Sequence, residues 1–194
     1  MSFWGRVGIV RYKCIVLVGP SGTGKSTVKD LLVSQGHVRF GVTCTSRPAR
    51  PDEVDGRDYD FLTLDDFKAA QDRGEMAEET DYISNKGKPY GILRHRIAEA
   101  EAANLPTLWI LDTHGLAWMR QHFGILHVLS IALTADEKCL RKRLKRRDGT
   151  AGKRLKRYAE EVILALNACD RAIETSTRTP EQVAATIRAM MGVS

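Results

Sequence analysis

The chain carries the stretch Gly19-Pro20-Ser21-Gly22-Thr23-Gly24-Lys25-Ser26, which matches the phosphate-loop pattern G-x-x-x-x-G-K-[ST]. The apolar residues 14–18 before it predict a buried strand, and residues 27–33 after it predict a helix. In this order, glycines let backbone N–H groups surround phosphate oxygens, and the helix start adds partial positive charge. A glycine turn that binds nothing is the alternative. The context favours a polyphosphate site, with Lys25 at the β- and γ-phosphates and the Ser26 hydroxyl on Mg²⁺.

Length and composition indicate one ordinary globular domain. The chain has 194 residues, of which 43% are hydrophobic and 28% charged. Its cysteines are scattered, which predicts reduced thiols in a cytoplasmic protein rather than disulfides or a zinc site. No apolar run reaches the roughly 20 residues of a membrane span, and we expect neither a signal peptide nor a membrane partner. The four cysteines are Cys14, Cys44, Cys139 and Cys169.

The net charge of +6 is concentrated in one segment. Residues 138–157 contain eleven Lys or Arg and one acid, Asp148. A solvated helix face, a nucleic-acid patch and a mobile lid over polyphosphate are three interpretations. Because a phosphate loop is present and its ligand carries several negative charges, we favour the lid and rank nucleic acid last.

Strands and helices alternate along the chain, which predicts an α/β fold with a mainly parallel sheet. Further strands are expected at residues 108–111, 126–133 and 172–174, and short extended pieces at 41–45 and 59–64. Helices are expected from residue 65, at about 93–104, after 134, at about 154–166 and at 181–190. Ligands of such sheets lie beyond the carboxyl ends of the strands. The phosphate loop, Asp112 and the basic segment are therefore expected on one rim.

A second constellation lies at residues 43–61, which read TCTSRPARPDEVDGRDYDF. Arg47 and Arg50 lie three residues apart between prolines and can clamp one phosphate, with Tyr59 as a further donor. Turn chemistry alone is the other interpretation. The stretch resembles the guanylate kinase signature T-R-x-x-R-x-x-E-x-x-G-x-D-Y-x-F. The resemblance covers roughly residues 13–173.

This resemblance implies a P-loop NTPase three-layer sandwich with a nucleoside monophosphate (NMP)-binding subdomain and a lid. We expect the core at 13–38, 93–135 and 160–194, the NMP-binding segment at 39–92 and the lid at 136–159. The implied reaction transfers the γ-phosphoryl group of ATP to GMP or dGMP, with Mg²⁺ as cofactor. The ATP-binding residues expected are Gly19, Pro20, Ser21, Gly22, Thr23, Gly24, Lys25, Ser26 and Thr27.

The same resemblance assigns roles to the acceptor side. Arg47, Arg50, Tyr59 and Tyr90 match the residues that bind the acceptor phosphate. Thr43 and Glu78 match those that contact the guanine edge. The Glu78 carboxylate suits this role, because it can accept hydrogen bonds from both N1–H and the exocyclic amine of guanine. Asp112 matches an acid at the end of a core strand. The catalytic residues expected are Lys25, Arg47, Arg143, Arg147 and Arg154, with Arg157 as a rival for the last.

Several positions depart from the family pattern. Ile92 replaces a Ser or Thr whose hydroxyl helps contact the purine O6, and His114 replaces a second acid. Glu174-Thr175 replaces an Asn-Asp pair near the donor base, the spacer at 81–89 is long and the lid is short. These departures leave open a modified purine deoxynucleotide as acceptor.

Two other functions remain as alternatives. One is a kinase with a ribose-phosphate acceptor, which would have no use for the base-reading Glu78. The other is a guanylate-kinase-like binding module without activity, although such modules tend to lose the phosphate loop. The sequence leaves monomer or homo-oligomer undetermined.

Overall fold

The computed structural model describes residues 12–84, 88–148, 155 and 157–192, and a five-stranded sheet lies at its centre. The strand order is β2-β7-β1-β8-β9, and every neighbouring pair is parallel. Because the strands run in one direction, their carboxyl ends meet at one rim, as expected. The strands are β1 (Cys14–Val18), β2 (Arg39–Phe40), β7 (Thr107–Ile110), β8 (Val128–Thr134) and β9 (Arg171–Glu174).

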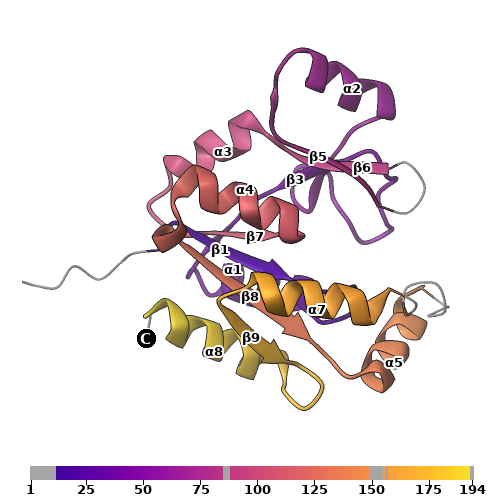
Figure 1. Cartoon of the computed structure of the whole chain (residues 1–194), viewed down its shortest axis with the longest axis vertical. Coiled ribbons are helices and arrows are strands. Elements are labelled where there is room, and N and C mark those ends of the chain that lie inside the picture. Colours follow the sequence, from indigo (N-terminus) through magenta and orange to yellow (C-terminus); the bar gives the residue numbers. More distant parts are fainter. Residues whose placement is uncertain (1–11, 85–87, 149–154, 156, 193–194) are drawn as a thin grey trace, which may run out of the picture.

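Alternate side chains of β1 face opposite sides of this sheet, and a hydrophobic core lies on each side. Ile15 and Leu17 pack with α1 (Lys25–Ser34) and α8 (Pro180–Met191). Cys14, Val16 and Val18 pack in a second cluster with residues of α3 (Arg94–Glu101), α4 (Thr113–Phe123) and α7 (Tyr158–Ala168). This arrangement confirms the α/β three-layer sandwich (Figure 1).

A second, four-stranded sheet of order β4-β3-β6-β5 stands apart from the first and supports α2 (Figure 1). Its small core contains Phe67, Met76 and Cys44. Gly91 in β6 packs closely against this core, because a Cβ there would lie 2.2 Å from the Met76 Cε and displace the end of that side chain. The elements are β3 (Thr43–Thr45), β4 (Tyr59–Phe61), α2 (Leu64–Asp72), β5 (Met76–Ser84) and β6 (Lys88–Leu93).

The basic segment begins as the helix α5 (Glu137–Asp148) after β8. Its Leu140 and Leu144 are buried and lie against the phosphate loop, since a Cβ at Gly22 would be 3.2–3.3 Å from their side chains. The apolar face of α5 therefore packs on the loop, and Arg143 of the same helix donates to the Gly22 carbonyl oxygen.

An ion pair and a hydrogen-bonded serine connect α4, β8 and the turn before β9. Ser130 Oγ donates to the Asp170 carboxylate at 2.6 Å and accepts from Arg120, which also contacts Asp170 at 2.8 Å. Partial burial alone would raise the pKa of Asp170, but hydrogen bonds from Ser130 and the charge of Arg120 outweigh it and lower that pKa.

Several expected elements differ from those observed. Neither the β5–β6 hairpin nor α4 was expected from the sequence. Residues 39–40, expected to open the NMP-binding segment, pair with β7 in the core sheet instead. The helix expected at about 93–104 ends at Glu101, and that expected from residue 154 is described from Tyr158. Within the described part of the chain, no helix combines the length and apolar character needed to span a membrane.

Candidate active site

A cavity of about 1140 Å³ lies on the rim where the carboxyl ends of the core strands meet. The phosphate loop, the 43–59 segment, the end of β7 and α5 all contribute to its walls. The structure thus brings together nearly all the residues expected in the site. The expected residues that line it are Gly19, Ser21, Gly22, Thr23, Gly24, Lys25, Ser26, Thr27, Thr43, Arg47, Arg50, Tyr59, Glu78, Tyr90, Asp112 and Arg143.

The phosphate loop connects β1 to α1 and has the geometry that its glycines predict. A Cβ at Gly19 would lie 2.2 Å from the Leu133 carbonyl oxygen, so only glycine fits there. Gly24 has a left-handed φ of 96° immediately before α1 begins at Lys25. The Lys25 ammonium donates to the carbonyl oxygens of Gly19 (2.5 Å) and Pro20 (2.8 Å). The Lys25 side chain therefore folds back across the phosphate loop. Pro20, which is not among the lining residues, contacts Lys25 through its backbone carbonyl oxygen.

The two arginines of the 43–61 segment converge on one carboxylate. Arg47 donates two hydrogen bonds to Glu53, both 2.6 Å, and a third to the Tyr90 hydroxyl at 3.0 Å. Arg50 donates to the same carboxylate through its backbone N–H (2.8 Å) and its guanidinium (3.2 Å). The Arg47 guanidinium also lies 4.7 Å from the centre of the Tyr59 ring. Arg47, Arg50, Tyr59 and Tyr90 thus lie together around Glu53, and we call these four residues the arginine cluster.

The ionisation of this cluster follows from its pairing. Burial alone would lower the pKa of Arg47, but hydrogen bonds to Glu53 and Tyr90 outweigh it and raise that pKa. Burial alone would raise the pKa of Glu53, but Arg47 and Arg50 lower it. Burial raises the pKa of Tyr59. Arg47 and Glu53 are therefore charged and Tyr59 is a neutral hydrogen-bond donor at neutral pH.

Thr43 and Glu78 lie on the cavity wall and are nearly inaccessible, with 6% and 5% exposure. The start of α4 closely approaches Glu78, because a Cβ at Gly115 would lie 3.3 Å from Glu78 Oε1. Asp112 caps α4, and its Oδ1 accepts from the backbone N–H groups of His114 (3.0 Å) and Gly115 (2.9 Å).

Two residues that depart from the family pattern, Ile92 and His114, do not line the cavity, although their sequence positions suggested contact with the substrates. Ile92 is completely buried in the core beneath the sheets and is not part of the cavity wall, although it pairs with Glu78 across β5 and β6. His114 is exposed on the first turn of α4 and is also not part of the wall. An apolar core contact, rather than a contact with the base, therefore accounts for the side chain at position 92.

The arginines expected at the lid fall into two groups. Arg143 lines the cavity and donates to the Gly22 carbonyl (3.3 Å) and to the hydroxyl and carbonyl oxygens of Thr175 (3.0 and 2.9 Å). Thr175, at 4% exposure, is thus tied to Arg143 and the phosphate loop. Arg147 lies in α5, but its side chain is outside the described part, and Arg154 lies outside the described residues.

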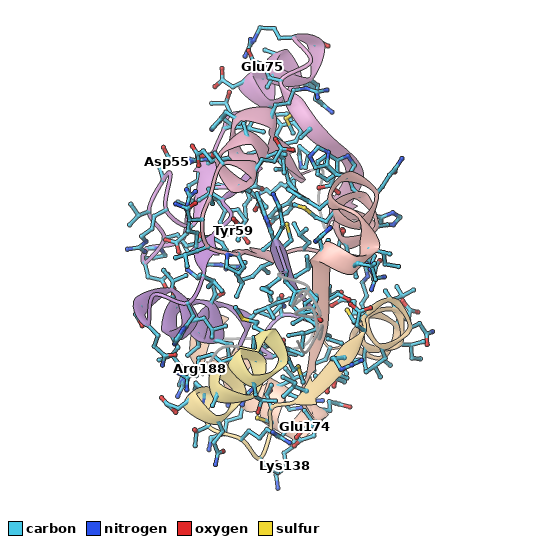
Figure 2. The ribbon with its side chains drawn as sticks, turned by 90° about the vertical axis from the view of Figure 1, so that its left-hand side faces the viewer. Asp55, Tyr59, Glu75, Lys138, Glu174 and Arg188 are labelled. Atoms are coloured by element: carbon cyan, nitrogen blue, oxygen red, sulfur yellow. The ribbon has the colours of Figure 1, made fainter. Side chains whose placement is uncertain are left out.

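Several charged residues of the cavity were not predicted from the sequence, and two of them, Glu53 and Lys29, bear directly on its geometry. Glu53 belongs to the guanylate kinase signature, but the sequence pattern did not indicate its function. In the structure its carboxylate orders the arginine cluster. Lys29 lies one helical turn after Lys25 and lines the same cavity. The i, i+4 spacing between Lys25 and Lys29 in the expected helix could have indicated that both side chains lie on the same face. Figure 2 shows Tyr59 towards the interior of the molecule and Asp55 at the outer edge of the same segment.

Comparisons with known proteins agree with this geometry. The guanylate kinase family model matches residues 11–177. A guanylate kinase of Ralstonia nicotianae is 34% identical over 180 residues, covering 87% of this chain and 80% of that protein. One of Chlorobium luteolum is 32% identical over 160 residues, covering 82% and 80%. The crystal structure of guanylate kinase from Anaplasma phagocytophilum superposes with a TM-score of 0.70 at 26% identity, covering 92% of this chain and 84% of that one. The chain belongs to the guanylate kinase family of nucleoside monophosphate kinases.

Proposed function

We propose that this protein transfers the γ-phosphoryl group of ATP to GMP or dGMP and releases ADP with GDP or dGDP. The observation that carries the proposal is that one cavity is lined by a phosphate loop, a separate arginine cluster and a nearly inaccessible carboxylate, Glu78. The loop supplies a site for a triphosphate, the cluster a site for a second phosphate, and Glu78 an acceptor for the guanine N1–H and amine. The similar proteins from Ralstonia nicotianae and Chlorobium luteolum are named guanylate kinases, and this name supports GMP as the acceptor.

The chemistry asks for positioning and charge stabilisation rather than a strong base. The acceptor is a phosphate, which is already anionic near neutral pH. Two polyanions must be brought into line, and charge must be stabilised while the phosphoryl group moves. Lys25 and the arginines that line the cavity would supply this positive charge. Exclusion of water increases the effect of each charge and prevents transfer to water.

Mg²⁺ fits the proposed donor side. The Ser26 hydroxyl lies on the cavity wall in the first turn of α1, and the Asp112 carboxylate lies on the same wall. Both are oxygen ligands of the kind that Mg²⁺ prefers, alongside water and substrate phosphates. When bound, the ion would neutralise phosphate charge. Arg143, Arg147 and Arg154 are proposed to add positive charge from the lid side.

The segment boundaries also belong to the proposal. The NMP-binding segment corresponds to the second sheet with α2, and the lid to the basic segment from α5 onward. We propose that the protein acts in the cytoplasm, which suits its four free thiols.

The test is a panel of acceptors with Mg·ATP, in which ADP release is measured with GMP, dGMP, AMP, dAMP and pyrimidine monophosphates. We expect rapid turnover with GMP or dGMP, and a loss of about 10³-fold or more in Lys25→Ala, because the lysine contacts the transferred phosphoryl group. Calorimetry with ATP tests whether the donor binds at all. Turnover of a ribose phosphate instead, or binding without turnover of any acceptor, would contradict the proposal.

A further inference from the structure

Lys29 is a buried lysine with no role in the reaction as derived so far. We propose that Lys29 is a positioning residue that connects the helix of the phosphate loop to the acceptor-phosphate segment, residues 47–59, and so sets the distance between the two phosphate sites. The inference rests on the proposed function for the identity of the acceptor. It concerns a residue that contacts the segment rather than the reacting atoms.

The environment of Lys29 is unusual for a lysine. Its side chain is only 8% exposed, although it lies on α1 beside a water-accessible cavity into which a flexible ammonium can extend. Lysine side chains normally keep the charged end in water. A lysine that stays buried requires partners that replace its hydration. The partners therefore show what holds the side chain in place.

Among the described residues, three groups contact the Lys29 ammonium. Asp30 lies 2.5 Å away, but the Asp30 side chain is 67% exposed, so this neighbouring pair is screened by solvent. The ring of Phe40, at the end of β2, has its centre 4.6 Å from the Lys29 Nζ, which is within the range of a cation–π contact. Asp58 lies 3.4 Å away and its side chain is only 18% exposed. Asp58 is the better-buried carboxylate and the only one of the three groups that belongs to the acceptor-phosphate segment.

Asp58 in turn organises that segment. Its Oδ2 accepts from the backbone N–H of Val54 at 3.0 Å and from Arg57 Nε at 2.8 Å, so it closes the turn that follows Glu53. The next residue is Tyr59, whose ring packs on the Arg47 guanidinium. A shift in the position of Asp58 would therefore also move the arginine cluster, because only one peptide unit separates Asp58 from Tyr59 and a short turn separates it from Glu53.

The consequence concerns alignment of the substrates. In-line transfer requires the acceptor oxygen and the γ-phosphorus to approach closely, and a misplacement of about 1 Å can reduce the rate by about 10²-fold. Lys25 and Lys29 lie on the same face of α1, one turn apart. The first would contact the donor phosphates, and the second joins the acceptor segment to the same rigid helix. Loss of Lys29 should therefore impair use of the acceptor more than binding of ATP.

The experiment compares Lys29→Met with Lys29→Arg and Asp58→Asn in the full-length chain. Methionine keeps an unbranched side chain that can pack on Phe40, so the variant tests the charge with little change in packing. Steady-state kinetics give KM and kcat for GMP and for ATP, and calorimetry gives GMP affinity without ATP. We expect kcat/KM for GMP to fall about 10- to 100-fold in Lys29→Met, with KM for ATP changed less than about twofold. Lys29→Arg should recover most of the loss.

Asp30→Asn is the matched control, because it removes the exposed partner only, and it should leave kcat/KM within about twofold of wild type. The double variant Lys29→Met/Asp58→Asn should lose less than the sum of the two single losses, because both changes remove the same Lys29–Asp58 link. A Lys29→Met enzyme with wild-type kcat/KM for GMP, equal losses for GMP and ATP, or additive effects in the double variant would overturn the proposal. A wild type that neither binds nor phosphorylates GMP overturns the proposed function instead. Coupling of Lys29 and Asp58 in thermal unfolding then tests the link alone: additive shifts refute it and non-additive shifts support it.

Discussion

Replacement of Ile92 by serine tests whether this position belongs to the core or to the base-binding wall. The Ile92 side chain has no exposed surface and packs among buried residues that include Trp109 and Leu116. Truncating such a side chain to alanine size costs about 2–5 kcal/mol of unfolding free energy. A buried hydroxyl adds about 1–3 kcal/mol if it finds no partner. A hydrogen bond from the hydroxyl to a nearby backbone carbonyl would remove that addition.

We therefore expect Ile92→Ser to lose about 3 kcal/mol of stability, which for a chain of this size lowers the melting temperature by roughly 6–12 °C. Urea and thermal unfolding measure the loss. Ile92→Ala isolates the hydroxyl, and Ile92→Val should lose only about 0.5–1.5 kcal/mol. Because Ile92 is not part of the cavity wall, the ratio of kcat/KM for GMP to that for AMP should stay within about threefold, less than 1 kcal/mol of discrimination.

Two results would refute this reasoning. A serine variant as stable as wild type would show that Ile92 does not fill the core. A GMP-to-AMP ratio that rises tenfold or more would show that the side chain at position 92 reaches the base, as its place in the family pattern suggested. The alanine variant distinguishes a contact made by the hydroxyl from an effect of the added space.

Two further substitutions test particular contacts. In Gly115→Ala the new Cβ would lie 3.3 Å from Glu78 Oε1; we expect KM for GMP to rise about tenfold with little change for ATP, measured by steady-state kinetics, and an unchanged KM would contradict a role for this close approach. In Asp170→Asn we expect a loss of about 1–2 kcal/mol at pH 7, because the partly exposed carboxylate loses its charge. The lowered pKa of Asp170 means that this stabilisation is present above the ordinary aspartate pKa of about 3.9 and is lost as pH falls further. Urea unfolding from pH 7 to pH 3 should show the two proteins converging in acid, and a constant difference would contradict this assignment.

The central strands of the core sheet could be predicted from the sequence because they are largely continuous apolar runs. Residues 14–18 are buried throughout, and so are 128–133, and this is what a parallel sheet covered on both faces requires. The hairpin of β5 and β6 could not be predicted in this way. Residues 76–84 mix acids with apolar residues, and β6 contains a proline and a glycine. Strand pairing and packing on α2 stabilise the hairpin, and neither leaves a local pattern.

The start of α4 was missed for a different reason. Its first residues, Thr113-His114-Gly115, are poor helix formers. Asp112, which caps the helix, was interpreted from the sequence only as a site residue. A Cβ at Gly115 would crowd both Leu111 and Glu78, and the contact with Glu78 joins residues 37 positions apart in the sequence. Motifs located the phosphate loop and the arginines, whereas the residues that position them, such as Glu53 and Lys29, became evident only from three-dimensional contacts.

Glu53 illustrates why an acid can lie within a proposed phosphate-binding cluster. Without a counter-charge, Arg47 and Arg50 would repel each other and remain flexible, and ordering them would oppose binding. Glu53 holds both guanidinium groups through charge-assisted hydrogen bonds of 2.6–3.2 Å. The cost is repulsion between this carboxylate and an incoming phosphate. A Glu53→Gln enzyme would remove that repulsion and much of the ordering together, so the direction in which its affinity for GMP changes reveals which effect dominates.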